Sequence, residues 1–242
     1  MIFSHYKRFL RFKPLVGIAL FIVLIIGVSF LISNPFSDED KTVAIILSPH
    51  AGDAYVGLGG LIDQKGSNVI VVDVFNGTDT GTTTPVIDST NTSVQLVKLQ
   101  YSERDGTPEE ISISLSQDIQ ALISGNKDKI VSVYAPSYFT DDITPKEHAI
   151  VSEAFRNVAS NYPDMNVQFY VYEDFPYINQ FNLSSVVSVQ RHIENTFDIR
   201  FTKVEIPLTK VPEGSESIRA YKQTRCGENP NRACEIVYKL ER

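Results

Sequence analysis

A histidine and an aspartate stand three residues apart in Pro49-His50-Ala51-Gly52-Asp53, directly after a short apolar run rich in β-branched residues. Imidazole nitrogens and carboxylate oxygens are donors that bind Zn²⁺ in proteins. A turn that follows a buried strand of an α/β sheet carries its side chains to the carboxyl edge of the sheet, where open α/β folds bind their ligands. We therefore predict that His50 and Asp53 are two ligands of a metal site.

A catalytic zinc ion needs a third protein ligand and one coordination position left open for water. His148 is the best candidate, because it stands near the start of a predicted helix that follows a predicted strand at 131–135. Of the two other histidines, His5 is excluded because it lies on the cytoplasmic side of a predicted membrane anchor, and His192 is a weak candidate because it is expected on a helix surface. The alternatives are structural, since Asp53 could cap the following helix and His148 could be an ordinary helix-start residue.

These segments resemble the zinc-dependent PIG-L/LmbE-type N-acetylglucosaminyl deacetylases. The signature of that family is a strand followed by P-H-x-D-D-[EA], a glycine pair, and much later H-x-D-H in front of a helix. The first motif is matched by Pro49-His50-Ala51-Gly52-Asp53-Ala54 with Gly59-Gly60, and the place of the second is taken by Pro145-Lys146-Glu147-His148. Two further segments look similar to family segments: Tyr172-Glu173-Asp174-Phe175-Pro176-Tyr177 and, weakly, Tyr221-Lys222-Gln223.

The resemblance extends over roughly residues 42–225 and implies zinc bound by His50, Asp53 and His148. It departs from the family at two catalytic positions. The family's general base is replaced by Gly52, and the histidine that helps to stabilise the oxyanion is replaced by Pro145. Another carboxylate could take over the role of the base, and the candidates from segments expected near the site are Asp141, Asp142, Glu147, Glu173 and Asp174.

Two functions follow from this pattern. In the first, the chain is a membrane-anchored, outward-facing zinc hydrolase that deacetylates N-acetylated amino sugars of a glycan or glycolipid. In the second, it is a catalytically impaired relative that binds a metal or a sugar, or acts as an interaction domain. The retained ligands favour the first function, and the residues at positions 52 and 145 favour the second.

The surrounding sequence predicts the elements that would position these residues. Apolar, β-branched runs indicate strands at 42–47, 68–75, 129–135, 167–172, 203–206 and 236–240. Helices are expected at 54–65, 116–124, 144–159 and 215–225, and a long loop at 76–93. Strands that alternate with helices are typical of a parallel sheet covered by helices. The sequence therefore predicts one Rossmann-like α/β domain over residues 42–242.

The first part of the chain predicts a membrane anchor. Residues 14–33 form an uncharged, mostly apolar stretch that is long enough to cross a bilayer. Basic residues precede it in segment 1–13, and acidic residues close the short linker 34–41 that follows. This asymmetry predicts a cytoplasmic N-terminus and an extracytoplasmic domain. A cleaved secretory signal is the alternative.

The net charge indicates which partners the chain can bind, and the cysteines indicate the compartment of the domain. The formal net charge of −7 argues against nucleic acid as a partner, because binding phosphates requires a basic surface. The two cysteines, Cys226 and Cys234, flank a segment rich in turn-forming residues. In an exported domain, this spacing predicts a disulfide bond.

Overall fold

The computed structural model describes residues 41–50, 52–75, 94–102, 104–137, 146–175, 186–208, 220–223 and 233–241. The predicted anchor at 14–33 and the predicted loop at 76–93 lie outside this set, as do Asp141, Asp142 and Pro145. Among the described residues, no helix combines the length and the apolar character that a membrane span requires.

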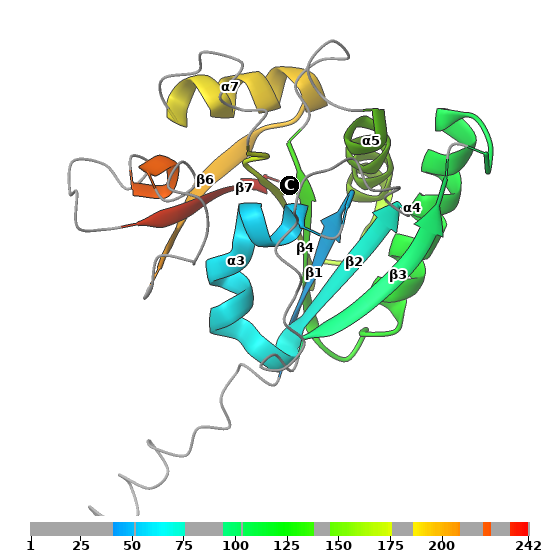
Figure 1. The fold of residues 1–242 in the computed structure, drawn as a ribbon, viewed down its shortest axis with the longest axis horizontal. Helices are drawn as coiled ribbons and strands as arrows, with labels where there is room; N and C mark the ends of the chain where they lie inside the picture. The colour runs from blue at the N-terminus through cyan, green and yellow to red at the C-terminus, as the bar shows by residue number, and fades with distance from the viewer. Residues whose placement is uncertain are drawn as a thin grey trace, which may run out of the picture. The chain divides into compact units, whose positions relative to one another are not determined.

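Seven strands form one mixed sheet in the order β3-β2-β1-β4-β5-β7-β6 (Figure 1). Their bounds are β1 Thr42–Ser48, β2 Val69–Phe75, β3 Gln95–Tyr101, β4 Ile130–Pro136, β5 Val167–Tyr172, β6 Phe201–Pro207 and β7 Cys234–Leu240. The strands from β3 to β5 pair in parallel, whereas β7 runs antiparallel to both of its neighbours. The predicted α/β fold with a mostly parallel sheet is confirmed, and its parallel part has the 3-2-1-4-5 order of Rossmann-type folds.

Helices cover both faces of this sheet (Figure 1). Helix α3 (Asp53–Lys65) packs on one face, and the short 3₁₀ turn η2 (Gly66–Asn68) joins it to β2. Helices α4 (Pro108–Ser124), α5 (Lys146–Asn161) and α7 (Val186–Phe197) pack on the other face. Strand β1 is buried on both sides, with Ile45 under α4 and α5 and Ile46 under α3. Burial on both faces explains why the sequence of β1 is continuously apolar rather than alternating.

Two glycines let α3 lie very close to its neighbours. A Cβ atom on Gly57 would come within 2.6 Å of the Tyr172 ring, and one on Gly60 within 2.0 Å of the Leu208 side chain. The Tyr172 hydroxyl, in turn, donates a hydrogen bond of 3.0 Å to the backbone carbonyl of Leu47. These glycines thus allow α3 to pack tightly, and this packing sets the height of α3 above β1 and β5.

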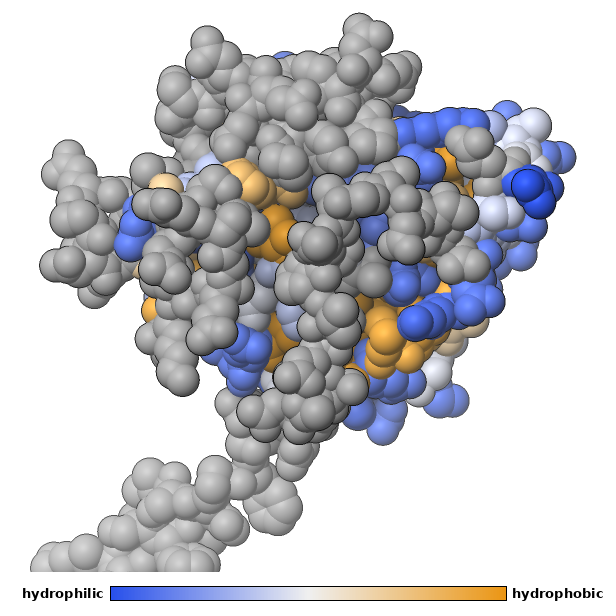
Figure 2. Space-filling view, viewed as in Figure 1, coloured by the Kyte–Doolittle hydropathy of each residue, from blue (hydrophilic) through white to orange (hydrophobic). Residues whose placement is uncertain are grey.

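Strand β3 and the first half of α4 were not predicted from the sequence, and α7 was implied only by the expectation that His192 lies on a helix surface. Strand β3 is an edge strand, and its exposed residues are mostly polar; the surface over β3 and α4 is mostly hydrophilic, as the right side of Figure 2 shows. Helix α4 begins at Pro108 rather than near 116. Its start is a capping box, in which the Glu110 backbone N–H donates to Thr107 Oγ1 and the Thr107 N–H donates to Glu110 Oε2 at 2.8 Å.

The C-terminal strand carries a disulfide-bonded cysteine. Cys234, the first residue of β7, is disulfide-bonded, and no cysteine among the described residues is free. The other cysteine of the sequence, Cys226, lies outside the described residues. The adjacent Glu235 is buried and forms an ion pair of 2.6 Å with Lys222.

Candidate metal centre

The three predicted ligands converge on the carboxyl edge of the sheet. His50 lies in the turn after β1, Asp53 is the first residue of α3, and His148 lies in the first turn of α5, the helix that follows β4. Their ligand atoms all lie within 4.8 Å of one another. From β1 the chain first builds β2 and β3 outward and then returns to β4 on the other side of β1. The cluster therefore sits at the topological switch point, where folds of this kind bind ligands.

Two distances within the cluster are close to those of a metal shell. Asp53 Oδ2 lies 3.2 Å from His50 Nδ1 and 3.3 Å from His148 Nε2. Two donor atoms that bind one zinc ion tetrahedrally, each at about 2.1 Å, stand about 3.4 Å apart. The spacing of Asp53 from each histidine thus fits a shared metal ion, and all three ligand atoms lie within 4.8 Å of one another.

Backbone hydrogen bonds hold the turn between β1 and α3. Ser48 Oγ accepts a 3.0 Å hydrogen bond from the Ala54 N–H and donates its own proton to the His50 carbonyl. The same carbonyl accepts from the Asp53 N–H at 3.0 Å, and Asp53 Oδ2 accepts from the His50 N–H at 2.9 Å. Because the turn is bonded from both ends, His50 and Asp53 are positioned before any metal arrives.

A buried carboxylate orients His148 from behind. Asp174 Oδ2 lies 2.6 Å from His148 Nδ1, and the Asp174 backbone N–H donates to Ser137 Oγ at 3.1 Å. A carboxylate accepts hydrogen bonds, so Nδ1 carries a proton, and Nε2 is the ring nitrogen that faces Asp53. Burial alone lowers the pKa of His148, but the Asp174 carboxylate, helped by Asp53 and Glu147, raises that pKa above its ordinary value. This carboxylate–histidine pair is the usual support of a metal-binding imidazole.

Two imidazole nitrogens and one carboxylate oxygen define the chemistry of the cluster. Catalytic zinc sites use three protein ligands of this kind, and so do the open sites of non-haem iron oxygenases. In both classes the positions left free by the protein bind water or substrate. The cluster of His50, Asp53 and His148 could therefore hold a metal ion with open coordination positions.

Three of the carboxylates proposed from the sequence as replacement bases are among the described residues: Glu147, Glu173 and Asp174. Their surroundings differ. The Asp174 carboxylate is hydrogen-bonded to His148. The Glu173 carboxylate accepts hydrogen bonds from the Tyr238 hydroxyl, at 2.7 Å, and from the Tyr221 hydroxyl. Glu147 lies in the first turn of α5, next to His148, and is partly exposed. Asp174 and Glu173 are therefore both engaged by neighbouring side chains, and Glu147 is the one that faces solvent in part.

One carboxylate near the site was not singled out in the sequence. Asp73 lies in β2, in direct register with Ser48 of β1. Burial raises the pKa of Asp73; the charges of Lys98 and His50 oppose that rise, and Asp53 adds to it. The signal for this residue was available, because Asp73 is the single charged residue in the otherwise apolar strand from Val69 to Phe75.

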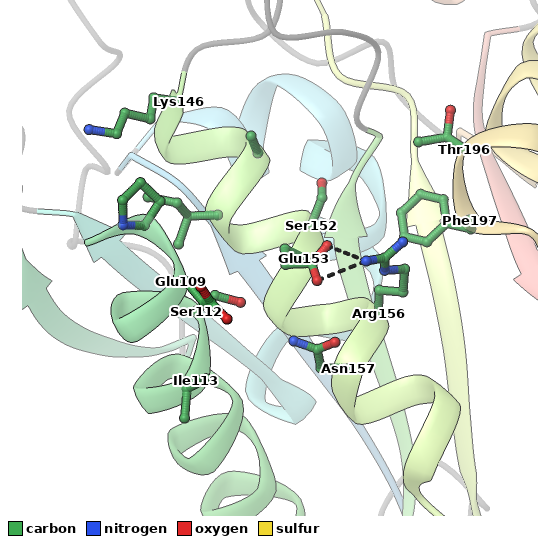
Figure 3. Close-up of a pocket in the computed structure, with 13 residues that line it drawn as sticks. Glu109, Ser112, Ile113, Lys146, Ser152, Glu153, Arg156, Asn157, Thr196 and Phe197 are labelled. Atoms are coloured by element: carbon green, nitrogen blue, oxygen red, sulfur yellow. Dashed lines mark hydrogen bonds and ion pairs between the residues drawn. The ribbon is translucent and has the colours of Figure 1, made fainter. Parts of the chain in front are cut away.

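A groove of about 860 Å³ lies elsewhere, between α4, α5 and α7 (Figure 3). Its walls have mixed charge, and Arg156 and Glu153 pair across 2.7 Å within it. One end reaches Lys146, at the start of α5, but none of the three metal-ligand candidates lines it. None of the candidate bases named from the sequence is among its described lining residues either.

Comparison with known proteins assigns no family. No family model and no curated protein matches the chain. A solved structure described as the conserved protein TT1542 from Thermus thermophilus aligns with 82% of this chain and 93% of its own, at 15% identity and a TM-score of 0.43. At that level of similarity, we infer neither fold nor function from the match.

Proposed function

We propose that this chain is a zinc-dependent hydrolase that removes acetyl groups from N-acetylated amino sugars of a glycan or glycolipid. The observation that carries the proposal is the convergence of His50, Asp53 and His148 at the switch point of the sheet. Asp174, which supports His148 from behind, gives the cluster the second layer that metal sites need. The resemblance of the motifs to the PIG-L/LmbE deacetylases supplies the substrate class.

The chain's own residues would divide the catalytic task. Zinc at this site would supply Lewis acidity, which polarises an amide carbonyl and lowers the pKa of water. His50, Asp53 and His148 would hold the ion, and Asp174 would keep the proton on His148 Nδ1. The buried turn after β1 would keep His50 and Asp53 fixed during turnover. A base must then accept the proton of the attacking water, and Gly52 cannot do so.

The proposed setting is the outer surface of a membrane. An anchor at residues 14–33, with basic residues before it and acidic residues after it, would hold the domain next to membrane glycans or glycolipids. Membrane fractionation, combined with protease accessibility of the domain in sealed vesicles, tests this placement. Protection of the domain from external protease in right-side-out vesicles would exclude it.

Metal content is the first test of the site. We expect about one zinc per chain in the purified full-length protein by elemental mass spectrometry, and loss of that zinc in His148→Ala. His192→Ala is the matched control, because His192 lies on α7 and is outside the cluster. A wild-type protein that binds no zinc after reconstitution, or that prefers iron, would contradict the proposed zinc site.

Deacetylation is tested next with the zinc-loaded protein. Oligosaccharides and glycolipids that contain N-acetylglucosamine are the substrates, and the readouts are free amine and released acetate. Activity that disappears in His148→Ala but persists in His192→Ala would support the proposal. A zinc-loaded protein that acts on none of these substrates would exclude the proposed substrate class.

The second candidate is a catalytically impaired relative that keeps the metal or the pocket for binding. The observation that favours it is Gly52, which caps α3 without a side chain at the family's general-base position. Its φ of −99° and ψ of −20° are open to any residue, so Gly52→Asp can be made without backbone strain. A strong rise in deacetylation from a near-zero baseline in Gly52→Asp would support this second candidate.

A further inference from the structure

Asp73 is the one carboxylate of β2, a strand whose other residues are all apolar. It lies on the face of β2 that packs toward α3, two residues after Val71 of the apolar cluster under that helix. Its Oδ1 atom is fully buried and has no hydrogen-bond partner among the described residues. An unsatisfied buried carboxylate oxygen costs folding free energy, so such groups are usually found where function requires them.

The position of Asp73 ties it to the metal centre. Asp73 stands in register with Ser48, the residue that bonds the turn carrying His50. Two residues later, the Phe75 N–H donates a 3.0 Å hydrogen bond to the Pro49 carbonyl, which keeps the end of β2 against that turn. The charges of His50 and Asp53 both act on the Asp73 carboxylate.

Asp73 is nevertheless not part of the ligand cluster. The three ligands lie within 4.8 Å of one another, and Asp73 does not join that group. A general base has to meet the proton of the water, directly or through one further water, rather than the metal. A carboxylate in register with the strand end that carries the ligands, but outside their cluster, is compatible with this role.

A structural role with Lys98 is the main alternative. Lys98 of β3 is paired in register with Asp73, and its charge attracts the carboxylate. However, the side chain of Lys98 is exposed, and no ion pair between the two residues is among those of the described chain. An exposed strand-edge lysine does not account for the buried oxygen that faces α3.

We propose that Asp73 is the general base that replaces the carboxylate missing at position 52, a proposal that rests on the proposed amide hydrolysis. The water oxygen forms a bond to the amide carbonyl carbon while one water proton moves to an Asp73 oxygen. The C–N bond then breaks, and Asp73 returns that proton to the departing nitrogen. The products are acetic acid, which keeps the second water proton, and the free amine of the sugar. The acid then gives that proton to the amine or to solvent and becomes acetate, so atoms and charge balance.

The test compares wild type, Asp73→Asn and the control Asp63→Asn in the zinc-loaded full-length protein. Asp63 is an exposed aspartate of α3, and the same change there alters the net charge equally. Asp73→Thr is the second variant, because threonine suits a strand if asparagine impairs folding. We expect all variants to retain zinc, since Asp73 is not a ligand.

The decisive probe is acetohydroxamate, measured by calorimetry in buffers of different ionisation enthalpy. In wild type the hydroxamate proton passes to Asp73 and stays on the protein. In Asp73→Asn we expect about one more proton to be released to the buffer and affinity to fall about tenfold or more, the size of a lost charge-assisted hydrogen bond. Deacetylation should fall about 10²–10⁴-fold in the same variant.

The outcomes separate the two proposals. Equal proton release and affinity in wild type and Asp73→Asn, with zinc retained, would overturn the role of Asp73 while leaving the hydrolase proposal intact. Retention of the hydroxamate proton by Asp73, without deacetylation of any N-acetyl sugar, would support the assignment of Asp73 and overturn the proposed substrate class. Absence of zinc from the wild type would overturn both.

Discussion

His148 stands between two carboxylates, with Nδ1 at 2.6 Å from Asp174 and Nε2 at 3.3 Å from Asp53. In Asp174→Asn the amide keeps the shape of the side chain but removes the charge that stabilises the ring and fixes its proton. We expect zinc affinity to fall about 10–100-fold, the usual effect of losing such a partner. Competition titration against a zinc chelator measures this effect. Glu153→Gln on the same helix is the control, and unchanged affinity in Asp174→Asn would exclude the supporting role.

At the scale of single residues, the sequence was enough to predict the three candidate ligands but not the contacts of the side chains around them. His50 and Asp53 were found because they lie in one short motif, and His148 because it starts a helix. Glu173 was among the expected bases, but it is bonded to Tyr221 and Tyr238 from distant parts of the chain. Pairing between residues so far apart in sequence is decided by tertiary packing, and a local pattern does not reveal it.

At the scale of single elements, α3 depends on a buried ion pair. The helix is kinked at Leu58, and past the kink Glu235 accepts the backbone N–H groups of Gly60 and Leu61 at 2.8 and 2.9 Å. The same carboxylate pairs with buried Lys222 at 2.6 Å. Glu235 thus caps the second half of α3 from β7 and neutralises Lys222.

Glu235→Gln should therefore destabilise the protein strongly, by about 3–5 kcal/mol, because it leaves the Lys222 charge buried without a counter-charge. The double variant Glu235→Gln with Lys222→Met should lose less, because no buried charge remains, although the amide oxygen can accept from only one of the two α3 N–H groups. Urea unfolding of both variants measures the difference. Glu205→Gln, in the exposed pair with Lys203, should change stability by less than about 1 kcal/mol. A double variant no better than the single one would contradict this account.

The elements themselves were predictable to different degrees. Strongly apolar strands such as β1 and β2 were found with nearly correct ends, because burial on both faces leaves a continuous apolar run. The start of α4 was missed, although Thr107-Pro108-Glu109-Glu110 is a capping-box sequence with proline at the first helical position. Strand β3 is an edge strand whose alternating pattern, with inward Val97 and Leu99, is weaker than a continuous run.

For the whole molecule, the same strand order that gives the fold its stability also determines where chemistry can occur. The chain leaves β1 to build one side of the sheet and returns at β4 to build the other, so β1 and β4 end side by side. His50 lies in the turn after β1, and His148 lies in the first turn of α5, the helix that follows β4. The parallel alternation of strands and helices was readable from the sequence, but the antiparallel pair of β7 and β6 was not, because neither strand differs in pattern from a parallel one.

The stability of the whole domain should depend on pH through the titration of Asp73. Burial raises the pKa of Asp73 above its unfolded value, so the folded state holds the proton to higher pH. Stability is therefore lost as pH rises from the unfolded pKa, about 3.9, through the raised folded one. Asp73→Asn has no proton to lose there. Without metal, the free energy of unfolding of Asp73→Asn should be equal to or lower than that of wild type below this pH window. At neutral pH it should be higher than that of wild type by about 0.5–2 kcal/mol.

Urea unfolding of the metal-free proteins between pH 3.5 and pH 8, in the presence of a chelator, measures that difference. Subtracting wild type from Asp73→Asn cancels the titration of all groups that the two proteins share. Asp63→Asn, the exposed control, should show no step in the same range. A gain that appears only above the window would mean that the fold tolerates Asp73 at a cost in stability, as expected of a group kept for function. A loss of stability above the window would instead make Asp73 a structural partner of Lys98, because an ion pair that holds β2 to β3 stabilises the folded state wherever the carboxylate is charged.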